Sequence, residues 1–139
     1  MRSNRMKIAV MLASLCVMAL VGSTGPALAN AGPSCTTGSS SGNVSTCFTI
    51  IGQGLFVGEM HATAQILTSS RTLLECIHGP DSGVPVCSPT RTIPTVGVLP
   101  VTWNPNRTVA AGSYCARTWR VNADGTQDLI GEVCFDVHS

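Results

Sequence analysis

The chain has 139 residues, of which 44% are hydrophobic and 11% are charged, and its formal net charge is +1 at pH 7. Three of its eight basic residues lie within the first seven positions, so the rest of the chain carries five arginines, no lysine and seven acidic residues. That remainder has no basic cluster to neutralise phosphates and no second apolar span long enough to cross a bilayer. Nucleic-acid binding and a membrane span after the first segment are therefore not expected.

The first 29 residues predict a secretory signal peptide. Three basic residues precede the apolar run 8–21, and a small-residue cleavage pattern ends at Ala29. The apolar run is shorter than the roughly 20 residues that a membrane anchor needs. We therefore expect a secreted, extracellular protein in which residues 30–139 form a single β domain.

Six cysteines follow the signal peptide, and an even number in an exported chain predicts three disulfides. Pairing in sequence order closes two short loops and one hairpin, whereas a zinc site is disfavoured because the sequence has no CxxC motif. With every sulfur paired, no free thiol nucleophile remains. The predicted disulfides are Cys35–Cys47, Cys76–Cys87 and Cys115–Cys134.

Short segments with the period of a strand follow in chain order. Residues 30–45 are rich in Gly, Ser and Thr and predict a leader that the first disulfide ties down. Segment 44–51 predicts a strand. In 55–67 apolar and polar residues alternate, which favours a strand, with a helix as the alternative because Ala, Met, Gln and Leu form helices well. Segment 71–78 predicts a further strand, with Leu74 and Cys76 on one face.

The next two segments are a loop and an edge. Residues 79–85 are dense in turn formers and lie between Cys76 and Cys87, so they predict an exposed, covalently closed loop. Segment 92–103 alternates like a strand but contains two prolines, which cannot donate to a ladder. It is therefore predicted to be an edge strand or a strand-like connection.

Segment 114–137 predicts a β-hairpin around Asp124-Gly125, because two runs rich in β-branched and aromatic residues flank this turn dipeptide. A bend centred there brings Cys115 opposite Cys134, and a four-residue loop fits a cystine best. The same register predicts outward pairs and an inward, mostly apolar face. The outward pairs are Arg117 with Glu132 and Trp119 with Ile130, and the inward pairs are Tyr114 with Phe135, Ala116 with Val133 and Thr118 with Gly131.

Together these elements give roughly six to eight short strands and no convincing helix, a pattern typical of a small disulfide-stapled antiparallel β-sandwich or a small barrel. The start of the late strand, Gly112-Ser113-Tyr114-Cys115, resembles an immunoglobulin-type strand in which a Tyr precedes a Cys. That resemblance implies a two-sheet architecture and nothing about function. In composition the chain is similar to small secreted proteins of actinomycete-type bacteria, which assigns no residue a role.

Motifs for catalysis are missing. No predicted strand-to-helix turn carries a GxSxG elbow, and we expect no cofactor, no metal and no enzymatic activity. A less favoured alternative is a small extracellular hydrolase that uses Glu59 and His61, two residues on one face of a predicted strand. The more frequent explanation for such a pair is the solvated face of an amphipathic strand.

The hypothesis that we favour is a secreted, non-catalytic binding or interaction module. It presents the disulfide-closed loop 77–86 to an extracellular protein, as an inhibitor of an extracellular enzyme would. The alternative is a structural, cell-envelope-associated protein that contacts itself or a surface polymer through an edge strand. The predicted binding surface consists of His78, Gly79, Pro80, Asp81, Ser82, Val84 and the outward-facing Trp119.

Overall fold

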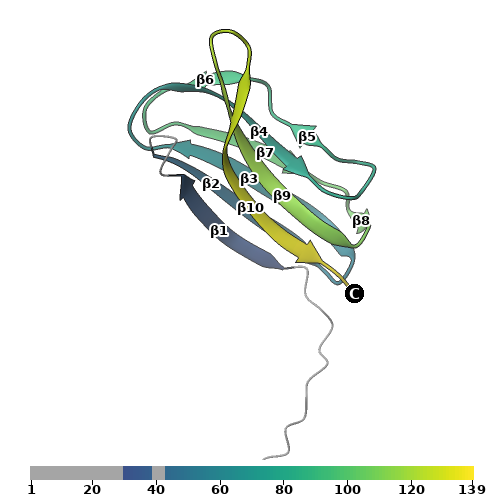
Figure 1. Ribbon diagram of the computed structural model, residues 1–139. Helices are drawn as coiled ribbons and strands as arrows, with labels where there is room; N and C mark the ends of the chain where they lie inside the picture. The colour runs from purple at the N-terminus through teal and green to yellow at the C-terminus, as the bar shows by residue number, and fades with distance from the viewer. Residues whose placement is uncertain (1–29, 39–42) are drawn as a thin grey trace, which may run out of the picture.

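The protein is a two-layer sandwich of antiparallel sheets (Figure 1). The computed structural model describes residues 30–38 and 43–139, and within them it contains ten strands and no helix. The signal peptide predicted at residues 1–29 lies outside the described residues. The two separate sheets confirm the predicted sandwich and rule out the alternative of a closed barrel.

Sheet A has the order β1-β2-β3-β7, and a short strand β8 also pairs with β3. The segment 55–67 is thus a strand, as its alternation predicted, and not a helix. The leader is more ordered than its composition predicted, because its first half pairs with β2 as an edge strand. The strands are β1 (Ala31–Gly38), β2 (Val44–Gln53), β3 (Phe56–Ile66), β7 (Val98–Trp103) and β8 (Arg107–Thr108).

Sheet B has the order β10-β9-β4-β5, with β6 also paired to β4. The segment 92–103, predicted as one edge strand or strand-like connection, is not continuous, because a turn divides it between the sheets: Val96 has a φ of 63° and Gly97 donates to the carbonyl of Pro94. Each half is an edge strand of its own sheet, because β6 pairs only with β4 and β7 only with β3. The strands of sheet B are β4 (Arg71–His78), β5 (Val86–Cys87), β6 (Arg91–Ile93), β9 (Gly112–Val121) and β10 (Gln127–Val137).

The order of strands differs from the immunoglobulin one. In constant-type immunoglobulin domains the chain leaves the first sheet after two strands. Here β1, β2 and β3 run consecutively in sheet A before the chain crosses to β4. The resemblance at Tyr114 therefore extends to the two-sheet architecture but not to the connectivity.

All three predicted disulfides are present, and each joins two residues that face each other on neighbouring strands. Their Cα–Cα distances are 4.0, 4.1 and 4.1 Å for the Cys35–Cys47, Cys76–Cys87 and Cys115–Cys134 pairs. Each disulfide links strands within one sheet. Cohesion between the sheets therefore comes from the packed core and not from sulfur.

The β9–β10 hairpin has the predicted register from its open end up to Gly131, which pairs with Thr118. A β-bulge follows, so Leu129 and not Ile130 lies opposite Trp119. The extra residue also makes the connection five residues long, 122–126, where four were predicted. Ile130 packs against the core instead, because a bulge turns one additional side chain to the inner side.

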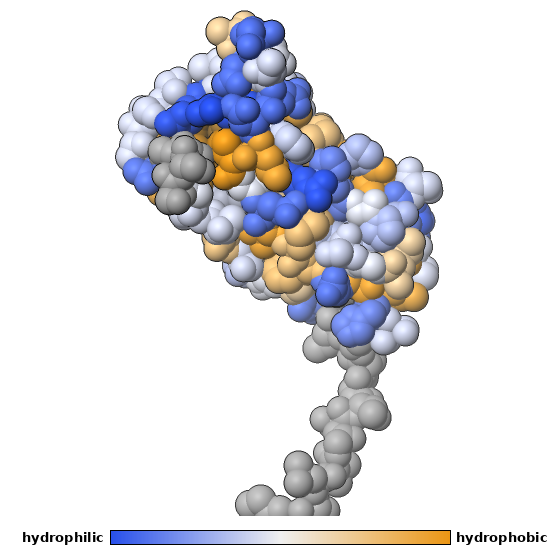
Figure 2. Space-filling model, in the orientation of Figure 1, coloured by the Kyte–Doolittle hydropathy of each residue, from blue (hydrophilic) through white to orange (hydrophobic). Residues whose placement is uncertain are grey.

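The predicted inner face of this hairpin is confirmed, since Tyr114, Ala116 and Thr118 have no exposed surface. Beyond the bulge the hairpin projects from the end of the sandwich as an arm (Figure 1). Figure 2 shows mainly polar residues along this arm, with one mildly apolar residue at its tip, and strongly apolar residues at its base.

Two apolar clusters fill the space between the sheets. The larger one includes Phe48, Ile77 and Ala116, and the smaller one includes Val44 and Leu73. A buried polar residue lies at the boundary of the two clusters on each of three strands. On β2 and β4 it stands between a residue of the smaller cluster and a residue of the larger one, and on β9 it follows the residues of the larger cluster. These polar residues are Thr46, Glu75 and Thr118.

Candidate binding surface

The loop that follows β4 is held by its own covalent bracket. Ile77 pairs with Val86 and Cys76 with Cys87, so the last residues of β4 and the two residues of β5 form a short ladder under the loop. Val84 is half-buried and packs against the larger core cluster. Both ends of the loop and one residue inside it are therefore fixed to the sandwich.

Asp81 ties the middle of the loop to β8 and to the segment that follows it. Its carboxylate accepts two hydrogen bonds from Arg107, at 2.6 and 3.1 Å, and one each from the backbone N–H groups of Gly83 and Ala110. These donors lower the pKa of Asp81 to about 2, with the Arg107 hydrogen bond as the main cause. The residue is 7% exposed, so its predicted place on the contact surface is wrong: it braces the loop from inside.

Tyr114 braces the start of the loop. Its ring packs so closely on Gly79 that a Cβ at this glycine would lie 2.3 Å from the ring, and Trp103 stacks on the same tyrosine ring with ring centroids 6.1 Å apart. The hydroxyl donates to the carbonyl of Ala110, 2.8 Å away and four residues upstream. A tyrosine that bonds back to the preceding turn in this way is a recurring feature of β-sandwiches.

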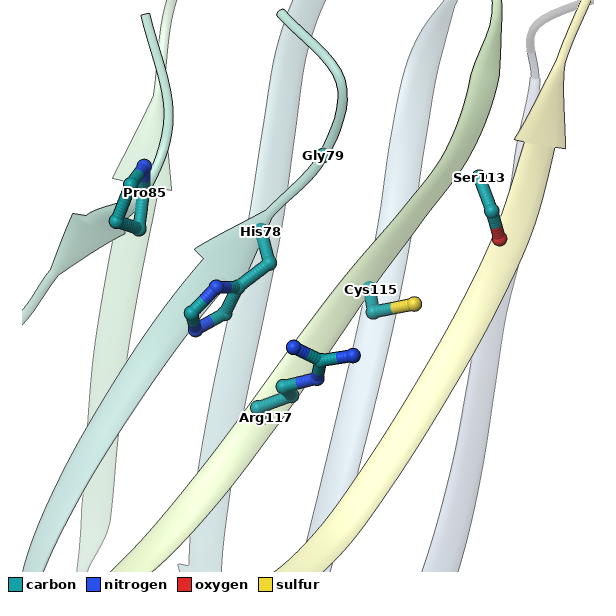
Figure 3. Close-up of a pocket in the computed structure, with 6 residues that line it drawn as sticks. All are labelled: His78, Gly79, Pro85, Ser113, Cys115 and Arg117. Carbon is teal, nitrogen blue, oxygen red and sulfur yellow. The ribbon is translucent and has the colours of Figure 1, made fainter.

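A hollow of about 280 Å³ lies next to the loop on the outer side of sheet B. Its lining comes from β4, β9 and the loop. Burial lowers the pKa of His78, and the Arg117 charge lowers it further. Arg117 is therefore the one charged residue of the lining at neutral pH. Figure 3 shows the terminal nitrogens of Arg117 between His78 and Cys115. The lining residues are His78, Gly79, Pro85, Ser113, Cys115 and Arg117.

The structure brings together most of the predicted surface. His78 and Gly79 line the hollow, while Pro80 and Ser82 are exposed on the loop beside it. Trp119 is half-buried on the outer face of the same sheet, paired with Leu74 of β4 and two positions along β9 from Arg117. The sequence reasoning missed Ser113 and Arg117. The predicted hairpin register already placed Arg117 on the outer face, and that was the available signal.

The two residues of the alternative hydrolase site, Glu59 and His61, are connected by a hydrogen bond, but they lie on sheet A and not on sheet B, where the loop and the hollow are. His61 Nε2 is 2.6 Å from Glu59 Oε1, and its Nδ1 is 3.0 Å from the hydroxyl of Thr102, a β7 residue that the sequence did not single out. The imidazole and carboxylate side chains are 42% and 35% exposed. Water screens such a pair, so this hydrogen-bonded chain has the character of a solvated strand face.

A second buried carboxylate lies between the sheets. Glu75 has no exposed surface, and its Oε2 accepts a hydrogen bond from Thr118, whose oxygen is 2.6 Å from that of Thr46 on the facing sheet. Oε1 has no hydrogen-bond partner among the described residues. Burial raises the pKa of Glu75 to about 8, so this carboxyl is protonated at neutral pH.

One cluster of metal-ligand side chains occurs in the described part of the chain, formed by Cys115, Cys134 and Glu132. Its two sulfurs are bonded to each other. A metal is bound by thiolates and not by a disulfide, so this cluster has no cysteine ligand to offer.

Comparisons with known proteins assign the chain to no family. Among residues 30–38 and 43–139 the structure contains no helix long and apolar enough to cross a membrane. No protein-family model, no curated protein and no solved structure matches the chain.

Proposed function

We propose that the protein is a secreted, non-catalytic binding module that contacts an extracellular protein through the loop 77–86 and the hollow beside it. The observation that carries this proposal is the bracing of the loop. A disulfide closes its base, Asp81 anchors its middle to Arg107, and Tyr114 packs on its first glycine. A loop that is ordered before binding loses less conformational entropy on binding, so bracing of this kind favours affinity. One form of this function is inhibition of an extracellular enzyme.

The alternative role, association with a cell-envelope polymer or a second copy through an edge strand, has weaker support. The long edge strand β10 carries a β-bulge and three carboxylates, at Asp128, Glu132 and Asp136. Bulges and charges on an edge oppose pairing with another strand. No observation of similar weight favours the hydrolase alternative.

The test is a substitution that changes the loop tip without disturbing its bracing. Ser82 is exposed and makes none of the bracing contacts, so Ser82→Arg should leave the fold intact and obstruct a docked partner. Ser69→Arg is the matched control, because Ser69 is also exposed but lies in the connection before β4, at the other end of that strand. The oxidised protein is immobilised and used to capture partners from the culture medium of its source.

We expect Ser82→Arg to lose the captured protein and Ser69→Arg to retain it. Affinities of the identified partner, measured by calorimetry, should fall at least tenfold for the first variant and stay within twofold for the second. A partner that binds both variants as tightly as the unchanged protein would exclude the loop as the contact surface.

A further inference from the structure

Arg117 presents a free pair of donors to the hollow. Its Nε donates to Oε2 of Glu132 on β10, and Arg117 makes no other side-chain hydrogen bond with the described residues. The Nη1–Nη2 edge of its guanidinium therefore remains available. Figure 3 shows these two nitrogens in the space between His78 and Cys115.

The shape of that edge selects the ligand. Two parallel N–H groups in one plane match the two oxygens of a carboxylate, and this bidentate pairing is among the strongest charge-assisted hydrogen bonds. The ion pair with Glu132 fixes the plane of the guanidinium in advance, so less rotational freedom is lost when a ligand binds. Glu132 is in this sense a positioning residue.

The remaining walls suit a small acidic group. Ser113 supplies a hydroxyl, the sulfur of Cys115 and the ring of Pro85 supply apolar surface, and the imidazole of His78 carries no negative charge that would repel a carboxylate. Glu132 and Asp136 lie on the neighbouring strand β10 and do not line the hollow. At about 280 Å³ the hollow falls just below the usual range of pockets for drug-sized ligands, and it is large enough for one side chain.

We propose that this hollow binds a single carboxylate of a protein partner, held by the Nη1–Nη2 edge of Arg117, while the partner's surface rests on the loop 77–86. The inference rests on the proposed function, because it assigns the carboxylate to a protein that docks on the loop. It predicts that an acidic residue, or the carboxyl terminus, is the anchor of the partner's contact surface.

The experiment uses nuclear magnetic resonance on the isotope-labelled, oxidised protein. Three probes are titrated: N-acetylglutamate amide for a side-chain carboxylate, N-acetylalanine for a terminal carboxylate, and N-acetylglutamine amide as the neutral isostere. We expect at least one acidic probe to shift the Arg117 Nε–H signal and the backbone amide signals of His78 and Ser113 in a saturable way. The neutral probe should shift none of them, and the stronger acidic probe identifies the source of the carboxylate.

Two variants locate the binding. Arg117→Gln should weaken the acidic probe at least tenfold, and Arg117→Lys, which keeps the charge but not the fork, should weaken it by a smaller factor. Arg120→Gln is the matched control: Arg120 lies three positions along β9 and also pairs with a carboxylate, Asp128, but does not line the hollow. It should bind like the unchanged protein.

Equal shifts by the acidic and neutral probes, or no shift from any probe, would overturn the carboxylate site. If this happens while Ser82→Arg still abolishes partner capture, the carboxylate assignment fails and the binding module stands. If the acidic probe binds at Arg117 but Ser82→Arg leaves capture unchanged, the carboxylate site stands and the loop-docking function fails.

Discussion

Asp81 and Glu75 are both buried carboxylic acids, and their pKa values move in opposite directions. Asp81 is 7% exposed and Glu75 is 0% exposed. The pKa of Asp81 falls to about 2, chiefly because of the Arg107 hydrogen bond, whereas burial raises that of Glu75 to about 8. Exposure alone therefore does not predict the charge state of either group.

The difference lies in the donors that each carboxyl meets. Asp81, at the rim of the sandwich, accepts hydrogen bonds from the guanidinium of Arg107 and from two backbone N–H groups. Glu75, between the sheets, accepts one from Thr118, and its Oε1 meets no donor among the described residues. Donors that favour the charged form outweigh desolvation at the first site, and desolvation dominates at the second.

The largest expected effect is a pH-dependent stability caused by Glu75. Its pKa is raised from 4.5 to about 8 in the folded protein, so between these values the folded state holds a proton that the unfolded state has lost. Raising the pH through this window therefore favours unfolding, and the contribution, fully present below pH 4.5, decreases by on the order of 3–5 kcal/mol by pH 8. Glu75→Gln should remove this decrease, as measured by denaturant unfolding between pH 4.5 and 8.5.

The comparison must be made between the variant and the unchanged protein at each pH. His78 also titrates differently in the two states: its pKa is lowered, so its contribution is lost as the pH falls below 6.5. This term has the opposite sign and is common to both proteins, so the difference between them isolates Glu75. A pH-independent difference would show that the buried carboxyl is not protonated at neutral pH.

A smaller effect of opposite pH dependence is expected at Asp81. Asp81→Ala removes the acceptor of the Gly83 and Ala110 N–H groups and should lower the free energy of unfolding by about 1–3 kcal/mol at pH 7, the usual penalty for unpaired buried donors. Because the pKa of Asp81 is lowered to about 2, its ionic contribution is present above pH 3.8 and lost as the pH falls towards 2.

The loss of unfolding free energy caused by Asp81→Ala should therefore be smaller at acidic pH than at pH 7. Asp136→Ala is the matched control, since Asp136 is exposed on β10 and should change the stability by no more than about 0.5 kcal/mol. Urea midpoints at pH 7 and pH 3 measure both variants. A deficit of the same size at both pH values would assign the effect to packing and not to the ionised carboxylate.

Sequence reasoning succeeded where the signal was local. Alternation identified the segment that became β3, and the spacing of Cys115 and Cys134 around an Asp-Gly turn gave both their disulfide and the inner face of the hairpin. The bulge at Ile130 was not predictable in this way, because a single unpaired residue leaves the alternation on either side almost unchanged.

The two buried carboxylates could not be located from the sequence because their environments come from distant segments. Asp81 meets Arg107 and Ala110, which are 26 and 29 positions away in the chain. In β4 apolar residues lie on both faces, so nothing in the alternation shows whether Leu74 or Glu75 points inward. Which of the two points inward depends on the pairing of β4 with β9 and on which face of sheet B packs against sheet A.

The smallest expected effect on stability is found by comparing the same threonine-to-valine substitution at a buried and at an exposed position. Thr118→Val removes a buried hydroxyl that lies between Glu75 and Thr46, and we expect a loss of about 1–2 kcal/mol because Glu75 Oε2 is left without a donor. Thr102→Val removes a hydroxyl that contacts His61 on the exposed face of sheet A, where water replaces the lost bond, so the change should stay within about 0.5 kcal/mol. Thermal and urea unfolding at pH 7 measure both. Equal losses would mean that the exposed Glu59–His61–Thr102 chain is an organised site and not a solvated strand face, because solvent could not then be replacing the hydrogen bond that the hydroxyl makes.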